Sequence, residues 1–462
     1  MQANFINMAD YNSNAAKLGT EKVGRLLLNY SIPSIISMIV VSLYSIVDRV
    51  FIGQGVGAMA ISGLALTFPL MALVAAIGTL VGVGAQTRMS IVLGMKDIPW
   101  ARNILGNAFF LTFILSTALV VPSMIFIDDI LRLFGGSDQT IPYAREYLMI
   151  VLPGSVFTNI SFSFSGLMRA SGYPMKSMIV ILIGVVLNVI LDPIFIFGFG
   201  MEIKGAAWAT IISMFVSAVF VMAHFFNKSS FVHFEKGAFR LKKRIIINIV
   251  SIGLSPFLMN AAAATVNIIL NNRLYQHGGD LAIGAFGIIN SYSAMFVMCV
   301  MGLCQGMQPI LGYNYGAHKL KRMKDTLLLT IKVAVTIMTI GFIVVQIFPR
   351  PLAMAFTTDE ELLDITVHGL RVIFAAFPVI GFQITVSNFF QSIGKVKQSI
   401  FMSLSRQVLL LIPFLYIFSS LWGLTGVWLS TAVSDVIAAV IAAFFLNYAK
   451  KYFYGSRKLA VK

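Results

Sequence analysis

The sequence predicts an all-α polytopic membrane protein with twelve transmembrane helices in two six-helix lobes. Three observations support this fold class. Of the 462 residues, 58% are hydrophobic and only 11% are charged; apolar runs long enough to cross a bilayer recur along the chain; and the second half repeats landmarks of the first. Soluble domains carry roughly 25% charged residues to cover their surface. Most of the outer surface of this chain is therefore expected to face lipid.

The apolar runs divide into two sets around a polar, basic interval. At 1.5 Å per residue, about 20 residues cross the roughly 30 Å of hydrocarbon in a bilayer. The expected spans are Leu26–Phe51, Ala58–Ser90, Ile104–Ile127, Tyr147–Leu167, Ser177–Phe199 and Ala206–Phe226, then Ile245–Leu270, Ala282–Tyr313, Leu327–Phe348, Val372–Phe390, Ile400–Phe418 and Val427–Leu446. The predicted domains are a cytoplasmic N-terminal segment (1–25), an N lobe (26–227), a cytoplasmic linker (228–244), a C lobe (245–448) and a basic cytoplasmic tail (449–462).

The distribution of charge sets the orientation of the chain and excludes two classes of protein. The net charge of +16 does not indicate a nucleic-acid binder, because the Lys and Arg residues lie at the ends of the apolar runs, mostly in alternate loops. Basic loops stay on the cytoplasmic side, so both termini are expected there. The only cysteines, Cys299 and Cys304, share one apolar run, and the five histidines are scattered, so no disulfide framework and no metal site is expected.

The two halves share landmarks at an offset of about 222 residues. The matched pairs are Pro33 and Pro256, Gln86 and Gln308, Gly94 and Gly316, Gly172 and Gly394, Ser177 and Ser399, Gly205 and Gly426, and Thr210 and Thr431. Because each copy has an even number of spans, the lobes are expected to share one orientation, related by a pseudo-two-fold axis along the membrane normal. Such a duplication favours a transporter that works by alternating access.

Three carboxylates stand inside the predicted spans: Asp48, Asp192 and Asp435. A charge near the bilayer centre costs at least roughly 2.5–3.5 kcal/mol, so each one calls for a reason. Burial and a like-charged neighbour both favour the protonated form of a carboxylate, which allows a proton to bind and leave; the same oxygens could hold Na⁺. Alternatively, Asp48 pairs with Arg49 or Arg88, and Asp435 pairs with Arg406.

The fifth span carries two polar groups on one helix face, Asn188 and Asp192 at i and i+4. Pro193 follows at once, which is expected to kink the helix and free the carbonyl group of Val189 as a further oxygen ligand. Alternatively, Asn188 and Thr210 only form hydrogen bonds between helices. Gly78, Gly82 and Gly84 resemble a phosphate-binding loop, but their place inside an apolar helix indicates close helix packing.

Several motifs together resemble the multidrug and toxic compound extrusion (MATE) family, whose members have twelve spans in two six-helix lobes. The resemblance covers nearly the whole chain. It rests on Tyr-Ser-Ile-Val-Asp at 44–48, Leu-Asn-Val-Ile-Leu-Asp-Pro at 187–193, Gly-Ala-Ala-Trp-Ala-Thr at 205–210, and Gln-Pro-Ile-Leu-Gly-Tyr-Asn-Tyr-Gly-Ala at 308–317. Together these motifs are specific, although each alone is weak.

The resemblance implies a cation site in the N lobe, as in the DinF-like branch of that family. The residues that it assigns to binding and coupling are Asp48, Asn188, Asp192 and Thr210, with Tyr44 as a supporting neighbour. Another branch carries a Glu in the seventh span, but 256–264 here reads Pro-Phe-Leu-Met-Asn-Ala-Ala-Ala-Ala, without an acid.

The halves differ at the positions of the two acids. The repeat offset carries Asp48 onto Asn271 or Asn272, and Asp192 onto the neighbourhood of Pro413. Coupling is therefore expected in the first lobe. The second lobe is expected to contribute mainly to substrate binding and packing, and Arg406 and Asp435 are a candidate polar pair there.

The expected function is H⁺- or Na⁺-coupled antiport that exports small, often cationic organic compounds, without an enzymatic step or cofactor. The resemblance places the protein in a bacterial inner membrane, and a chain that encloses its own cleft is expected to work as a monomer. One alternative is a lipid-linked oligosaccharide flippase of the same wider superfamily. A membrane-embedded enzyme is a second alternative, but convergent catalytic groups are lacking in the sequence.

Overall fold

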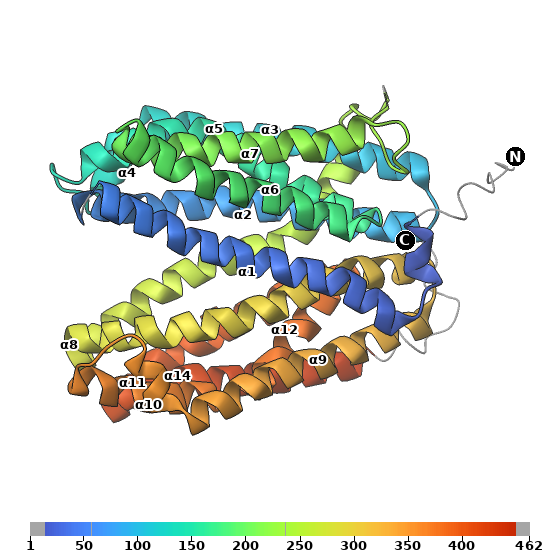
Figure 1. Ribbon diagram of the computed structural model, residues 1–462. Coiled ribbons are helices and arrows are strands. Elements are labelled where there is room, and N and C mark those ends of the chain that lie inside the picture. The colour runs from blue at the N-terminus through green and yellow to red at the C-terminus, as the bar shows by residue number, and fades with distance from the viewer. Residues whose placement is uncertain (1–13, 57, 236, 450–462) are drawn as a thin grey trace, which may run out of the picture. The chain divides into compact units, whose positions relative to one another are not determined.

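The computed structural model describes residues 14–56, 58–235 and 237–449, and every regular element in these ranges is a helix (Figure 1). The predicted N-terminal segment is described only from residue 14 onward, and nearly all of the predicted tail lies outside the described residues. The apolar composition thus folds into helices, which satisfy their backbone hydrogen bonds internally and so suit a bilayer.

The helices follow one another with short connections. In chain order they are η2 (Ala16–Gly19), α1 (Val23–Gly55), α2 (Ala58–Gly94), α3 (Ile98–Ile125), α4 (Ile127–Leu133), α5 (Ile141–Ala170), α6 (Pro174–Pro193), η3 (Ile194–Gly198), α7 (Glu202–Phe226), α8 (Lys243–Gly316), α9 (Leu320–Ile347), α10 (Pro349–Met354), α11 (Glu360–Phe374), α12 (Phe377–Ser392), α13 (Val396–Leu404), η4 (Ser405–Leu411) and α14 (Ile412–Tyr448).

These helices supply the twelve predicted spans. Among the described residues, nine helical stretches are long and apolar enough to cross a membrane, and the bent pair α11 and α12 makes a tenth. Two of the nine contain a break, α8 at Gly279 and α14 at Trp422 and Gly423. Gly279 has φ 62° and Gly423 has φ 56°, a left-handed conformation that glycine adopts at little cost. Each broken stretch therefore counts as two spans, which gives twelve.

The chain divides into two compact units. The first contains Ile36–Phe257 and the described residues before Lys22; the second contains Lys22–Ile35 and the residues from Leu258 onward. Helices α1 and α8 therefore each contribute to both units. The spacing of the apolar runs alone does not reveal this division.

In the first unit, α5 packs against α2, α3, α6 and α7 (Figure 1). Small residues allow these helices to approach closely. A Cβ added at Gly82 in α2 would lie 3.0 Å from the Cα of Ser163 in α5, and one added at Gly84 would lie 2.0 Å from the carbonyl oxygen of Ile249 in α8. The glycines of α2 therefore serve close packing.

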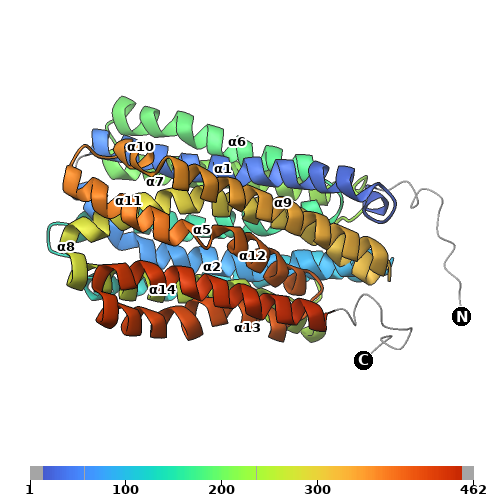
Figure 2. The same ribbon diagram turned by 90° about the horizontal axis from the view of Figure 1, so that it is seen from below.

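In the second unit, α12 packs against α9 and α14, and α11 packs against α14 (Figure 2). Both units contain a π-helical segment, η3 directly after α6 and η4 between α13 and α14. A π-helical turn accommodates an extra residue, and such turns often lie at functional sites. Each segment adjoins one of the polar sites described next.

Candidate functional site

Four helices of the first unit bring polar side chains together in an apolar surrounding. Asp48 comes from α1, Tyr147 from α5, Asp192 with Asn188 from α6, and Thr210 from α7. Apolar residues of α1, α5 and η3, including Ile52, Leu148 and Ile196, pack into one core cluster with Tyr147. Bulk water is therefore largely excluded from the polar groups.

The polar face of α6 forms as its sequence predicts. Asn188 and Asp192 are one turn apart, and both are 0% exposed. Pro193 is the last residue of α6, and the chain continues into the π-helical η3. Because proline lacks a backbone N–H, the regular hydrogen-bond ladder is interrupted beside Asp192.

Asn188 links α6 to α7. Its Nδ2 lies 3.3 Å from Oγ1 of Thr210. With the carboxamide turned over, which fits the surrounding groups better, its nitrogen donates to Oδ2 of Asp192 at 2.8 Å and its oxygen accepts from the backbone N–H of Thr210 at 3.2 Å. In that orientation Asn188 holds one carboxylate oxygen of Asp192 in place.

The carboxyl groups of Asp48 and Asp192 are close neighbours, near enough for each charge to act on the other. Arg88, a partner considered for Asp48, lies beside Arg244 instead. The side chain of Arg49, the other partner considered, lies outside the described residues. The arrangement is an acidic pair that can share one small cation.

Two tyrosines complete the site. Tyr44, expected as a supporting neighbour, and Tyr147 both lie near Thr210 and within electrostatic range of Asp48 and Asp192. Tyr147 was not among the candidates from the sequence. A tyrosine at the beginning of an apolar run usually marks the membrane interface, so the sequence carries no signal for a buried role.

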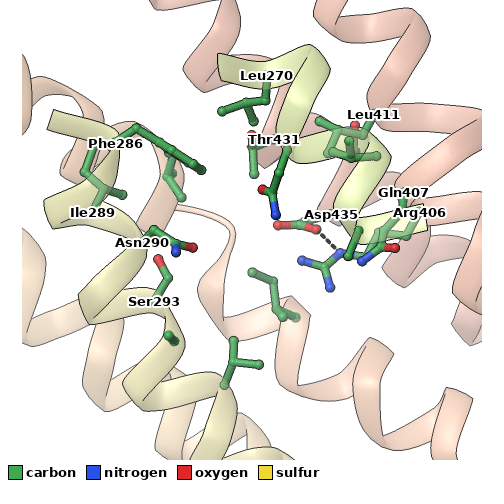
Figure 3. Close-up of a pocket in the computed structure, with 18 of the residues that line it drawn as sticks. Leu270, Phe286, Ile289, Asn290, Ser293, Arg406, Gln407, Leu411, Thr431 and Asp435 are labelled. Atoms are coloured by element: carbon green, nitrogen blue, oxygen red, sulfur yellow. Dashed lines mark hydrogen bonds and ion pairs between the residues drawn. The ribbon is translucent and has the colours of Figure 1, made fainter. Parts of the chain in front are cut away.

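A second polar site lies in the other unit. Nε of Arg406 donates to Oδ1 of Asp435 at 2.5 Å, and the pair lines a cavity of about 330 Å³ (Figure 3). Arg406 comes from η4, and Asp435 comes from the last part of α14. The structure thus separates the three intramembrane carboxylates of the sequence into an acidic pair in one unit and an ion pair in the other.

A family model, MatE, matches residues 33–194 and 245–417, which together make up most of the chain. The chain belongs to the MatE family. The matched blocks include the motifs around Asp48, Asp192 and 308–317 that carried the resemblance. The repeated halves and the twelve spans are therefore those of a MatE transporter, a multi-pass membrane protein.

Curated MatE relatives align over most of the chain. The multidrug export protein MepA of Staphylococcus aureus strain MSSA476 is 30% identical over 426 residues, covering 92% of this chain and 94% of the relative. The protein of the same name from strain NCTC 8325 / PS 47 is 31% identical over 432 residues, with the same coverage.

Solved structures match the fold. An outward-facing multidrug resistance transporter of the MATE family and the MOP superfamily aligns with a TM-score of 0.90 over 96% of this chain and 99% of that chain. A MOP superfamily transporter from Pyrococcus furiosus aligns with a TM-score of 0.89 over the same fractions. Both are 24% identical to this chain, so the likeness establishes the fold alone.

Proposed function

We propose that this MatE transporter exports small, often cationic organic compounds in exchange for H⁺ or Na⁺ that enters the site formed by Asp48 and Asp192. The curated relatives are named multidrug export proteins, which supports the direction and breadth of transport. The single observation that supports cation coupling is the close approach of the two carboxyl groups inside an apolar unit. The roles of Asn188, Thr210, Tyr44 and Tyr147 are to hold and solvate that pair.

The chemistry of the pair suits a small cation. Two neighbouring carboxylates repel each other in a low-dielectric surrounding, and a single proton or Na⁺ between them removes most of that repulsion. Oxygen atoms from Asp, Asn, Thr and Tyr are ligands that a hard cation accepts. Occupied and empty forms of the site should therefore differ by several kcal/mol in how well the surrounding helices pack.

Coupling requires that the cation and the exported compound favour different states of the protein. A ligand that binds both states equally shifts nothing, and the linkage between two ligands is reciprocal. In our proposal the cation stabilises one arrangement of α1 and α6 around the acidic pair, and the exported compound stabilises another. Entry of the cation down its gradient then drives release of the compound.

Transport into proteoliposomes tests the proposal and identifies the ion. A proton gradient and a sodium gradient are imposed separately on vesicles that contain the purified protein, and uptake of the cationic dye ethidium is followed by fluorescence. We expect one gradient to accelerate transport at least about fivefold over vesicles without a gradient, since a coupling free energy between two ligands is typically 1–3 kcal/mol. Equal transport with and without either gradient would contradict cation coupling.

We place the protein in the plasma membrane with both termini in the cytoplasm, acting as a monomer. The positive-inside distribution of Lys and Arg and the even number of spans support this orientation. The flippase alternative receives no support from the curated relatives described above, whose names refer to drug export.

A further inference from the structure

The second unit contains a cavity of about 330 Å³ that the acidic pair of the first unit does not use. This volume lies in the range of pockets that hold drug-sized ligands. Its walls are mainly apolar and include Phe286, Ile289 and Leu411, while Asn290 and Ser293 face the Arg406–Asp435 pair from the opposite side (Figure 3). The cavity therefore combines apolar walls with a few convergent polar groups.

The cavity shares one landmark of the sequence repeat with the acidic site of the first half. Thr431, which lines the cavity, is the repeat counterpart of Thr210. Arg406 has no charged counterpart, because the repeat offset places it at Gly184 or Val185. The cavity thus contains an arginine with one acid, whereas the site in the first half contains two acids, so the two differ in the charge that they present to a ligand.

The ion pair leaves most of the guanidinium group available. Asp435 binds only Nε of Arg406, and Nη1 and Nη2 have no acceptor among the described residues. The Arg406 side chain is 27% exposed, whereas that of Asp435 is 3% exposed. Asp435 is thus a buried positioning residue, and the two terminal nitrogens of Arg406 reach the cavity (Figure 3).

We infer that this cavity binds a drug-sized organic carboxylate, with the carboxylate on the terminal nitrogens of Arg406 and the apolar part against Phe286 and Leu411. A guanidinium edge with two parallel N–H donors matches a carboxylate in a bidentate manner. A purely cationic ligand would instead meet the positive guanidinium and would have to displace it from Asp435. The inference extends the substrate range of the transporter and does not depend on the acidic pair of the first unit.

Two kinds of carboxylate fit this chemistry. The Arg406–Asp435 pair has no net charge, so a monoanion adds a charge to a poorly solvated cavity, whereas a zwitterion adds none. The zwitterion also brings a donor, and Oδ2 of Asp435, Oε1 of Gln407 and Oγ1 of Thr431 are buried acceptors without a partner among the described residues. Matched probes can distinguish the two.

Binding to the purified full-length protein in detergent, without any ion gradient, tests the inference. The probes are naphthylpropionate, naphthylalanine, naphthylpropanamide and naphthylpropylamine, which share the aromatic part and differ in the charged end. We expect both carboxylates to bind at least about tenfold more tightly than the neutral amide and the amine. The tighter of the two carboxylates identifies the monoanion or the zwitterion as the better ligand.

Three variants locate the binding. Arg406→Lys keeps the positive charge but loses the planar fork, and the double variant Arg406→Gln, Asp435→Asn removes both charges without leaving a buried carboxylate unpaired. Each should reduce the preference for carboxylate over amide at least about fivefold, with thermal unfolding of each variant confirming a folded protein. Arg350→Gln, in the exposed ion pair with Glu360 of the same unit, is the matched control and should keep the preference.

Equal binding of the carboxylates and the amide by the unaltered protein would overturn the inference. A carboxylate preference that persists in the folded double variant would overturn it as well. Because no gradient is used, neither result depends on whether the acidic pair couples transport to a cation.

Discussion

Asp192 is fully buried in α6 and has no basic partner among the described residues. We predict that Asp192→Asn lowers gradient-driven export at least about tenfold, because an amide of the same shape cannot take up and release a proton or neutralise Na⁺. Asp48→Asn should have the same effect. Ethidium transport in proteoliposomes measures both.

The matched control for these variants is Asp138→Asn, whose carboxylate belongs to an ion pair with Arg132 and whose side chain is 95% exposed. This variant should transport at the normal rate, since exposed ion pairs contribute little. Undiminished gradient-dependent export in both Asp48→Asn and Asp192→Asn would refute the proposed site.

Tyr147 provides a second prediction at the residue scale. Tyr147→Phe keeps the ring within the core cluster but removes the hydroxyl group that lies near Thr210 and the acidic pair. We expect the concentration of coupling ion at half-maximal transport to change about three- to tenfold, the equivalent of one hydrogen bond, with little loss of folded protein.

Tyr143→Phe, one turn earlier in α5 and only half-buried, is the control and should leave that concentration unchanged. If Tyr147→Phe and Tyr143→Phe behave alike, Tyr147 only fills space.

The sequence could single out Asp48, Asn188 and Asp192 because a polar residue inside a long apolar run is conspicuous, whereas Thr210 entered the prediction through the family resemblance. It could not identify Tyr147, since tyrosine is common at the ends of such runs. The sequence could not predict that the carboxyl groups of Asp48 and Asp192 lie close together, because this depends on how α1 and α6 pack.

At the scale of the helix, a proline lies near the boundary of each π-helical segment. Pro193 predicted an interruption near Asp192, and the structure has one, the end of α6 followed by η3. The longer segment η4 contains no proline itself, but Pro413 follows two residues after its end, at the start of α14. Proline therefore marks both interruptions, and η4 carries Arg406 to the wall of the cavity.

Two glycines of α8 provide a prediction at the same scale. A Cβ at Gly253 would lie 1.7 Å from the carbonyl oxygen of Leu80 in α2, whereas one at Gly287 would meet nothing within 4 Å. Gly253→Ala should destabilise the protein by at least roughly 1–3 kcal/mol, because the backbones must separate. Gly287→Ala should change stability by less than about 1 kcal/mol, since alanine favours a helix.

Thermal unfolding of the purified protein, monitored by size-exclusion chromatography, compares the two glycine variants. A Gly253→Ala protein as stable as the Gly287→Ala protein would show that α2 and α8 do not pack closely in the membrane.

At the scale of the whole molecule, the duplication gives α1 and α8 corresponding positions in the two halves. They are the first helices of the two repeats, and each passes from one compact unit to the other, after Ile35 in α1 and after Phe257 in α8. The repeat pair Pro33 and Pro256 lies within three residues of these crossings. The repeat could be detected in the sequence. The points at which α1 and α8 pass from one unit to the other could not, because they depend on contacts between distant residues.

These prolines yield the last prediction. Proline removes one backbone hydrogen bond and disturbs the turn before it, so α1 and α8 should bend more easily where they pass between units. Replacing both prolines with alanine restores the backbone hydrogen bonds and should slow export about three- to tenfold. Ligand affinity should be retained, because stiffer helices slow the conformational change but leave the binding sites unaltered. Pro153→Ala, inside α5 and wholly within the first unit, is the control and should slow export less. Transport rate and equilibrium binding measured on the same preparations separate the two effects. A double variant that exports at the normal rate would mean that alternating access does not require bending at the crossings.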